Sequence, residues 1–239
     1  MTTRQALTGV LYGTRYTLNY KGLFYRTVWV EFPDIETVCI QVGAPPTTKK
    51  EDGSPGYTFP ILFDPSTKAI VADSAVIARY LDATYPDTPP VFPAGTAALQ
   101  AAFSDGVRSA CGGPLFMLTI ADIWRSLNTK SQGYFRTTRE KRFGAKLEEL
   151  RSEAQWELME AGFGKVDEWL KANGPGKDHL LMGDRICYSD FQLASVLMWA
   201  RTVCGEESED WARIASWHGG RWKRFLEYFD RYAIVDNVN

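Results

Sequence analysis

Cysteine and histidine are both scarce in this sequence. Its 239 residues include four cysteines and two histidines, which are Cys39, Cys111, Cys187, Cys204, His179 and His218. The cysteines show no CxxC spacing, and neither histidine has cysteine or carboxylate neighbours at ligand spacing. We therefore expect inert thiols in a reducing compartment, a cytoplasmic location and no metal site.

The chain also lacks an excess of basic charge and a long apolar run. Its formal net charge is −2 and no basic stripe is visible, which argues against a nucleic-acid partner. No apolar stretch is long enough to span a bilayer, so we expect no membrane partner. The residues after Met1 lack a charged region followed by an apolar one, so we expect no signal peptide. The length suits two domains with a sizeable core.

The first part of the chain mixes helical and strand patterns. We predict helices over 14–20, 34–42 and 73–83, a strand over 24–32, a loop over 44–56, and strands over 60–63 and 69–72. This order is the latter part of an α/β thioredoxin-like domain (βαβα-ββα), which we place over residues 1–93. Residues 1–7 contain one large apolar residue besides Met1, so the first strand is either reduced or missing.

The second part of the chain, residues 97–239, has the pattern of an all-helical domain. We predict a helix over 96–127, kinked near Gly112 and Pro114. A second, long helix begins at a capping box of Thr137 and Glu140 and ends at Asn173. Residues 188–202 are apolar almost all round, which is typical of a helix in the middle of a bundle. Two further helices follow, over 211–217 and 221–232.

A peptide-binding pattern lies at Thr58, Phe59 and Pro60. Proline cannot donate to a strand ladder, and X–Pro bonds are the only ones that adopt the cis form at low cost. We predict a cis bond before Pro60, which would turn the N–H and C=O of Phe59 toward an extended ligand backbone. The alternative is an ordinary trans proline at a sheet edge.

Thirteen residues after Pro60, Asp73 and Ser74 begin a helix. A helix N-terminus offers free N–H groups and a positive dipole end, which suit a carboxylate. Ser74 would donate to that carboxylate and Asp73 would accept from an ammonium group. Both residue types also favour N-caps for purely structural reasons. Combined with Pro60, they indicate a site for a γ-glutamyl peptide such as glutathione.

The organisation and these motifs resemble the cytosolic glutathione transferases, and more narrowly the fungal class related to bacterial β-etherases. The matching strings are residues 14–22, 63–67, 85–89 and 202–207, together with Asp190 at the head of the central helix. The resemblance covers nearly the whole chain. It implies glutathione as cosubstrate, a homodimer, and small aromatic or phenolic ligands. Members of this family can be catalysts, binders or both.

The resemblance also assigns roles to residues outside the opening motif. Lys50 would contact the glycyl carboxylate. The alternative is that Lys49 and Lys50 are two ordinary solvated lysines. Asp190 would cap a buried helix, with Cys187 in place of the usual Ser or Thr. An apolar helical stripe would line the ligand pocket, or else form ordinary core. The stripe comprises Leu115, Phe116, Met117, Ile120 and Trp124.

Glutathione chemistry requires a donor that stabilises the thiolate. The resemblance places this donor just before the first helix, but no serine precedes Ser54. Thr8 and Tyr12 are the candidate catalytic hydroxyls. We therefore hold two hypotheses: an enzyme that conjugates glutathione to hydrophobic aromatic electrophiles, and a non-catalytic ligandin for aromatic compounds. A non-binding interaction protein is a third reading.

Overall fold

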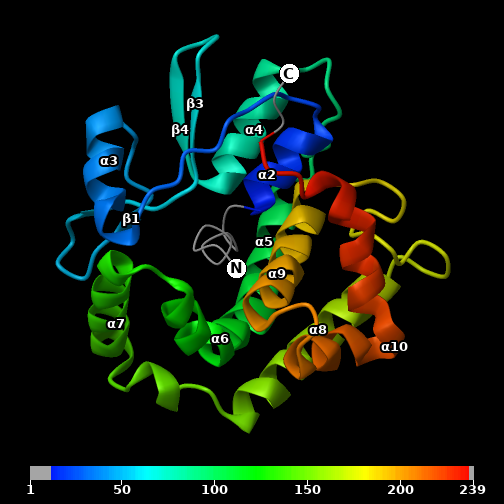
Figure 1. The fold of residues 1–239 in the computed structure, drawn as a ribbon. Helices are drawn as coiled ribbons and strands as arrows, with labels where there is room; N and C mark the ends of the chain where they lie inside the picture. Colours follow the sequence, from blue (N-terminus) through cyan, green and yellow to red (C-terminus); the bar gives the residue numbers. More distant parts are fainter. Residues whose placement is uncertain (1–11, 237–239) are drawn as a thin grey trace.

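A computed structural model describes residues 12–236, and it divides into a small α/β part and a larger helical part (Figure 1). The α/β part comprises α2 (Tyr12–Tyr20), η1 (Phe32–Asp34), α3 (Ile35–Val42), β1 (Thr48–Lys49), β2 (Pro55–Gly56), β3 (Ile61–Asp64), β4 (Ala69–Ala72) and α4 (Ser74–Thr84). The helical part comprises α5 (Ala97–Val107), the π-helical turn η2 (Arg108–Gly112), α6 (Gly113–Ser126), α7 (Thr129–Phe143), η3 (Leu147–Glu149), α8 (Glu153–Lys171), α9 (Tyr188–Cys204), α10 (Glu209–Phe229) and η4 (Asp230–Tyr232). This is the predicted thioredoxin-like domain with few strands, followed by a helical domain.

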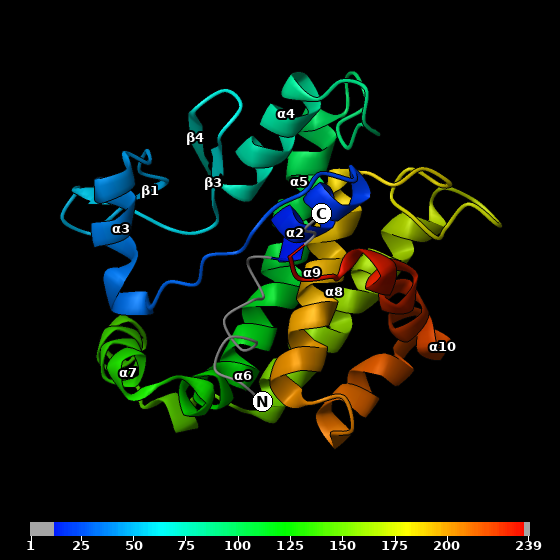
Figure 2. The same cartoon turned by 45° about the horizontal axis from the view of Figure 1, so that its top comes forward.

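The β3–β4 hairpin is the centre of the α/β part. Its antiparallel register pairs Ile61 with Ala72 and Asp64 with Ala69. Figures 1 and 2 show α3 on one side of the hairpin and α2 and α4 on the other. The inner face of the hairpin packs against a buried cluster that α2 and α4 supply, formed by Leu18, Ile77 and Leu81.

The strand predicted over residues 24–32 is wrong. Residues 24–31 form no strand, Phe32 begins η1, and among residues 12–236 no strand pairs with residues 24–31. Some backbone N–H groups of the predicted strand instead donate hydrogen bonds to side chains from distant parts of the chain. The N–H of Thr27 donates to Asp236 (2.6 Å) and that of Phe32 to Ser131 (3.3 Å). A β-rich composition therefore gives extended chain here, because a ladder needs a partner.

The loop predicted over residues 44–56 contains the small antiparallel pair β1 and β2. Gly56 is buried opposite Thr48, where an added Cβ would come within 2.3 Å of the Thr48 hydroxyl oxygen. The predicted loop is thus more ordered than its polar composition indicates.

The capping box predicted at Thr137 and Glu140 is also wrong. Both residues lie inside α7, which begins at Thr129. Asn128 is the actual cap, and its side-chain oxygen accepts from the N–H of Ser131 (3.0 Å). An upstream cap therefore starts the helix earlier, and Thr137 has helical rather than cap geometry.

The single helix predicted from Thr137 to Asn173 is two helices, because α7 ends at Phe143 and α8 begins at Glu153. The kinked helix over 96–127 and the central helix over 188–202 agree with the structure. The kink near Gly112 is the π-helical turn η2 between α5 and α6. Here α8 crosses closely, because an added Cβ on Gly162 would lie 2.1 Å from the carbonyl oxygen of Ala110. The central helix is α9, which packs against α2, α5, α6 and α10.

A buried carboxylate fixes the start of α9. One oxygen of Asp190 accepts from the N–H of Cys187 and the other from the N–H of Leu181, each at 2.8 Å. Burial raises the pKa of Asp190 to about 6, because the interior disfavours its charged form. Asp190 thereby connects the first turn of α9 to the loop before it.

Replacement of Asp190 by alanine should strongly destabilise the fold. Two buried N–H groups would lose their acceptors, so we expect the free energy of unfolding to fall by about 2–5 kcal/mol. Urea denaturation measures the change. Asp105, an exposed partner of Arg108, is the control, and D105A should change stability by less than about 0.5 kcal/mol. Equal losses in the two variants would contradict this role.

The raised pKa of Asp190 also predicts a pH dependence. The unfolded carboxyl titrates near about pH 4 and the folded one at about 6. The folded protein therefore binds this proton more tightly than the unfolded chain does. The stability that the bound proton contributes is lost as the pH rises from about 4 to 6. Relative to D190N, the parent should lose about 2 kcal/mol between pH 4.5 and 7.5. A pH-independent difference would show that Asp190 has an ordinary pKa.

Candidate functional site

The peptide bond between Phe59 and Pro60 is cis, as predicted. Pro60 is buried directly before β3, whereas Phe59 is half-buried. The carbonyl oxygen of Pro60 accepts from the N–H of Asp73 (3.2 Å). This hydrogen bond brings the two predicted halves of the site together, at the junction of β3, β4 and α4.

Asp73 is the N-cap of α4 and has an unusual backbone. One of its carboxylate oxygens accepts from the N–H groups of Ala75 (2.9 Å) and Val76 (3.1 Å). Its φ of 79° is in the left-handed region, which costs a non-glycine residue about 1–3 kcal/mol. Asp73 is exposed, and within residues 12–236 its second carboxylate oxygen has no hydrogen-bond partner. That oxygen is free to accept from a ligand.

Ser74 begins α4, and a tyrosine from the helical part fixes its hydroxyl. The phenol of Tyr188, at the start of α9, donates to the Ser74 oxygen (2.8 Å). Burial raises the pKa of Tyr188, so its phenol stays protonated at neutral pH and acts as the donor. A hydroxyl has one hydrogen to donate, and the hydrogen of Ser74 therefore remains available to a ligand.

The Ser74 N–H adds a second donor beside this hydroxyl. It is the first N–H of α4, and no described residue accepts from it. The two donors sit at the positive end of the helix dipole. This arrangement can bind a carboxylate in bidentate fashion.

Lys50 follows β1 and is already paired. Its ammonium contacts a carboxylate oxygen of Glu36 at 2.8 Å, and both side chains are about half exposed. The hydrogen bond with Glu36 raises the pKa of Lys50. Exposed pairs of this kind exchange readily with water and other anions.

The two candidate catalytic hydroxyls differ in what the structure shows of them. Thr8 lies outside the described residues. Tyr12 is the first residue of α2, is buried, and has its hydroxyl 3.5 Å from the hydroxyl oxygen of Thr202 on α9. Tyr12 therefore faces the helical part of the molecule.

The predicted apolar stripe on α6 divides into two sets. Leu115 and Ile120 are completely buried in the core, with exposures of 1% and 0%. Phe116 and Trp124 are half-buried. The ring of Phe116 lies 5.9 Å from that of Trp199, and the guanidinium of Arg136 lies 4.0 Å over Trp124. Met117 is half-buried as well, and Phe116 and Trp124 are the rings of the stripe that keep part of their surface exposed.

Burial makes the thiols of Cys111 and Cys204 unreactive. Desolvation by burial raises the pKa of Cys111 and of Cys204 to about 12, so both remain protonated at neutral pH.

Within residues 12–236, no group of three or more His, Cys, Asp or Glu side chains could hold a metal ion. Across the same residues, no helix has the length and apolar character needed to cross a membrane.

Sequence reasoning missed two residues of this region. Tyr188 reaches Ser74 across 114 positions of sequence, and Trp199 completes the aromatic surface at Phe116. Both are within an apolar helix whose pattern predicts only burial. A partner so distant in sequence leaves no local signal.

Comparisons with known proteins agree with this architecture. The family model of the glutathione S-transferase N-terminal domain matches residues 12–84, and that of the C-terminal domain matches residues 98–232. A curated relative, the glutathione S-transferase-like protein ustS of Aspergillus flavus, is 31% identical over an alignment of 225 residues, and the match covers 87% of this chain and 78% of that protein.

Two solved structures are more similar. Glutathione transferase GSTFuA3 from Phanerochaete chrysosporium is 53% identical with a TM-score of 0.93, and the match covers 95% of this chain and 91% of that one. The glutathione S-transferase CsGST63524 of Ceriporiopsis subvermispora, solved in complex with glutathione, is 42% identical with a TM-score of 0.92 and coverage of 96% and 92%. This chain therefore belongs to the glutathione S-transferase family.

Proposed function

We propose that this protein binds glutathione at the junction of β3 and α4 and transfers it to hydrophobic aromatic electrophiles. The observation that carries the proposal is Ser74. No residue in 12–236 accepts from its N–H, and its hydroxyl oxygen accepts from Tyr188, which leaves the hydroxyl hydrogen available to a ligand. The similar transferase solved with glutathione supports the choice of ligand.

Each part of glutathione has a counterpart in the site. The γ-glutamyl carboxylate would accept from the N–H and hydroxyl of Ser74, and the free oxygen of Asp73 would accept from the ammonium. The backbone of Phe59, before cis Pro60, would pair with the cysteinyl residue. Lys50 would exchange Glu36 for the glycyl carboxylate.

The reaction requires the thiolate of glutathione. A hydroxyl of Tyr12 or Thr8 would donate to the sulfur and lower its pKa. The sulfur then forms a bond to an electrophilic carbon, and a leaving group such as chloride departs with its bonding pair. Phe116 and Trp124, which α6 presents, would hold the ring of the acceptor, whereas Leu115 and Ile120 would support them from the core.

One observation favours the alternative, a non-catalytic ligandin for aromatic or polyphenolic compounds. The Tyr12 hydroxyl is buried and faces Thr202. If neither Tyr12 nor Thr8 reaches the sulfur, glutathione would bind without activation and the aromatic surface would act as a carrier.

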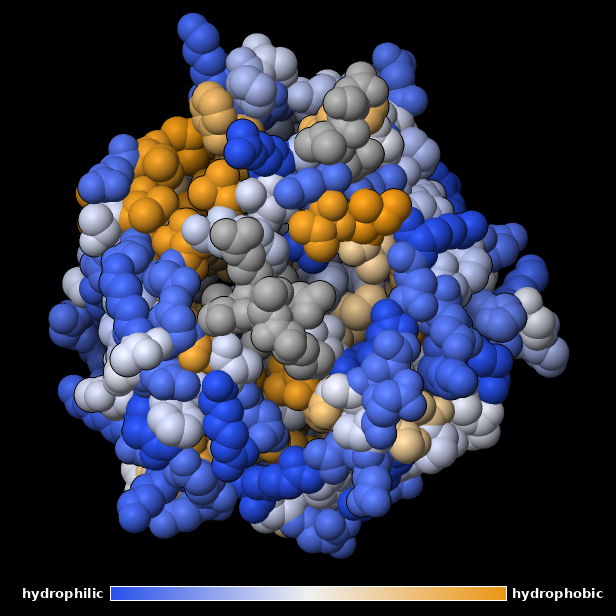
Figure 3. Space-filling view, viewed as in Figure 1, coloured by the Kyte–Doolittle hydropathy of each residue, from blue (hydrophilic) through white to orange (hydrophobic). Residues whose placement is uncertain are grey.

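We also propose a cytoplasmic homodimer. Four free cysteines within residues 12–236 are compatible with a reducing compartment. Figure 3 shows hydrophobic side chains gathered over α3 and the β3–β4 hairpin. These elements expose Ile40, Val42 and Phe63, and apolar surface of this kind supports a contact between subunits.

Removal of the Ser74 hydroxyl should weaken glutathione binding. A hydrogen bond to a charged group is lost, so we expect S74A to raise the dissociation constant about 10- to 100-fold. Calorimetric titration with S-hexylglutathione measures the change. Ser216, an exposed serine on α10, is the control, and S216A should bind like the parent. Unchanged affinity in S74A would refute the assigned site.

A measurement of turnover distinguishes the enzyme hypothesis from the ligandin hypothesis. With 1-chloro-2,4-dinitrobenzene as acceptor, we expect loss of the activating hydroxyl in Y12F or T8A to lower kcat about 10²-fold, with glutathione affinity retained. It should also shift the pH profile of kcat upward, because the bound thiol regains a higher pKa. A parent that binds glutathione but does not turn over supports the ligandin. If neither substitution lowers a measurable rate, the activating donor is a different group.

A further inference from the structure

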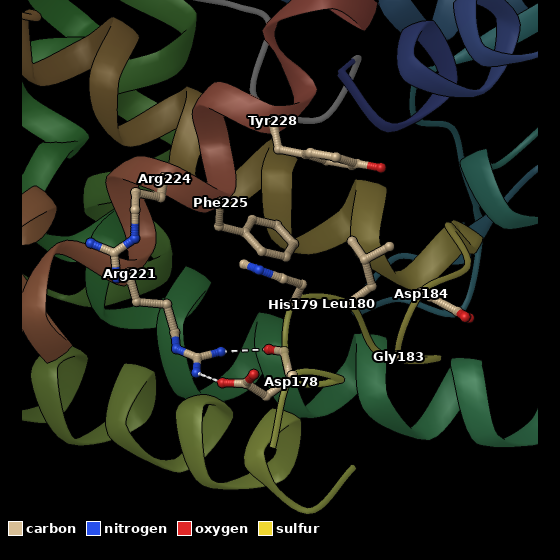
Figure 4. A pocket seen from close by; sticks show the side chains of 10 residues that line it. Asp178, His179, Leu180, Gly183, Asp184, Arg221, Arg224, Phe225 and Tyr228 are labelled. Atoms are coloured by element: carbon tan, nitrogen blue, oxygen red, sulfur yellow. Dashed lines mark hydrogen bonds and ion pairs between the residues drawn. The ribbon is translucent and has the colours of Figure 1, made fainter. Parts of the chain in front are cut away.

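A cavity of about 410 Å³ lies between α10 and the loop that joins α8 to α9 (Figure 4). Its lining comes from residues 176–184 and from residues 221–228, and it includes none of the residues assigned to glutathione or to the aromatic surface of α6. Small-molecule sites typically measure about 300–1,000 Å³. The cavity is therefore large enough for a ligand of one or two rings.

A break in α10 immediately precedes the residues of this helix that line the cavity. Trp217 leaves the helical conformation, and the next three residues have φ of 51°, 65° and 75°. Two of these three are Gly219 and Gly220, which adopt left-handed conformations without a Cβ penalty. The break redirects the second half of α10, so that it carries Phe225 and Tyr228 to the loop.

Arg221 closes the base of the cavity immediately after the break. Its guanidinium contacts Asp167 of α8 at 2.6 Å, donates to the carbonyl oxygen of Asp178 at 2.6 Å and pairs with the Asp178 carboxylate. These contacts join α8, α10 and the loop. The charge of Arg221 is therefore used in building the cavity and is not free for a ligand.

The loop itself is held in place from the opposite side. The side-chain amide of Asn173 donates to the carbonyl oxygens of Leu180 (3.1 Å) and Leu181 (3.0 Å), and Asp190 accepts from the N–H of Leu181. The wall is thus formed before any ligand arrives, which reduces the entropic cost of binding.

The centre of the cavity is formed by aromatic and aliphatic side chains. Phe225 and Leu180 are buried there, while Tyr228 is 45% exposed at the rim. Figure 4 shows the His179 ring beside Phe225, beneath Tyr228. No hydrogen bond to any residue in 12–236 involves the imidazole of His179, so it can donate to or accept from a ligand.

Two further charged residues of the lining, Arg224 and Asp184, lie away from Phe225. In Figure 4, Arg224 extends away from Phe225 and Asp184 lies at the opposite end of the cavity. The guanidinium of Arg224 donates to the carbonyl oxygen of Gly219 (2.7 Å). A charged group placed against Phe225 would therefore lose its hydration without an ion pair at that position.

We propose that this cavity is a second binding site, for a neutral, planar aromatic molecule with one hydrogen-bonding substituent. The ligand ring lies against Tyr228 and Phe225, and its substituent bonds to His179. The site is separate from the one proposed for glutathione, so the two are occupied independently.

Equilibrium dialysis with three naphthalene probes tests this proposal. The neutral probe is 1-naphthol, the anion is 1-naphthalenesulfonate and the cation is 1-naphthylmethylammonium, each measured with and without saturating S-hexylglutathione. We expect 1-naphthol to bind most tightly, with unchanged affinity in the presence of S-hexylglutathione. Preferred binding of either ion, or displacement of naphthol by S-hexylglutathione, would overturn the proposal.

Substitutions at the rim locate the bound probe. We expect Y228A to weaken naphthol binding about tenfold, because the stacking surface is lost, and H179A to weaken it severalfold. Both side chains are exposed enough to be removed without loss of the fold, which circular dichroism checks. The control is Y134A, since Tyr134 on α7 is 44% exposed, almost the same as Tyr228. Equal naphthol affinity in all three variants would exclude this cavity.

Discussion

The buried carboxylate of Asp190 is the constraint on which both sites depend. By accepting from the N–H groups of Cys187 and Leu181, it fixes where α9 begins and where the preceding loop runs. The start of α9 carries Tyr188, which orients the hydroxyl of Ser74. The loop carries Leu180 and His179, which line the cavity beside α10. One capping interaction therefore positions a binding group in each of two separate regions.

The site proposed for glutathione is assembled across the boundary between the two parts of the chain. The α/β part supplies the cis peptide bond, the strained cap and the helix N-terminus, whereas the helical part supplies the phenol of Tyr188. A second connection lies nearby: Asp82 pairs with the fully buried ammonium of Lys21 at 2.7 Å and accepts from the N–H groups of Val91 and Phe92. The N–H of Tyr188 in turn donates to the carbonyl oxygen of Val91 (2.9 Å). This chain of contacts holds Tyr188 at a fixed distance from α4.

Local signals were sufficient to predict some elements of the fold and not others. The turn between β3 and β4, Pro60 and the cap at Asp73 each depend on neighbours in sequence, and the structure has them as predicted. The strand over residues 24–32 was wrong because strand formation requires a partner that residues 12–236 do not provide. The same limit applies to the site. The aromatic pattern of α6 did not distinguish Leu115, which is core, from Phe116, whose ring meets Trp199 of another helix.

We propose that Tyr188 acts on glutathione only through Ser74, and a double-mutant cycle tests this coupling. S-hexylglutathione affinity would be measured for the parent, S74A, Y188F and the combined variant. If Tyr188 orients the Ser74 hydroxyl, its loss should weaken binding in the parent but have no further effect once that hydroxyl is gone. The combined variant would then bind like S74A. Fully additive losses would contradict the account, because they would mean that Tyr188 and Ser74 contribute to binding independently.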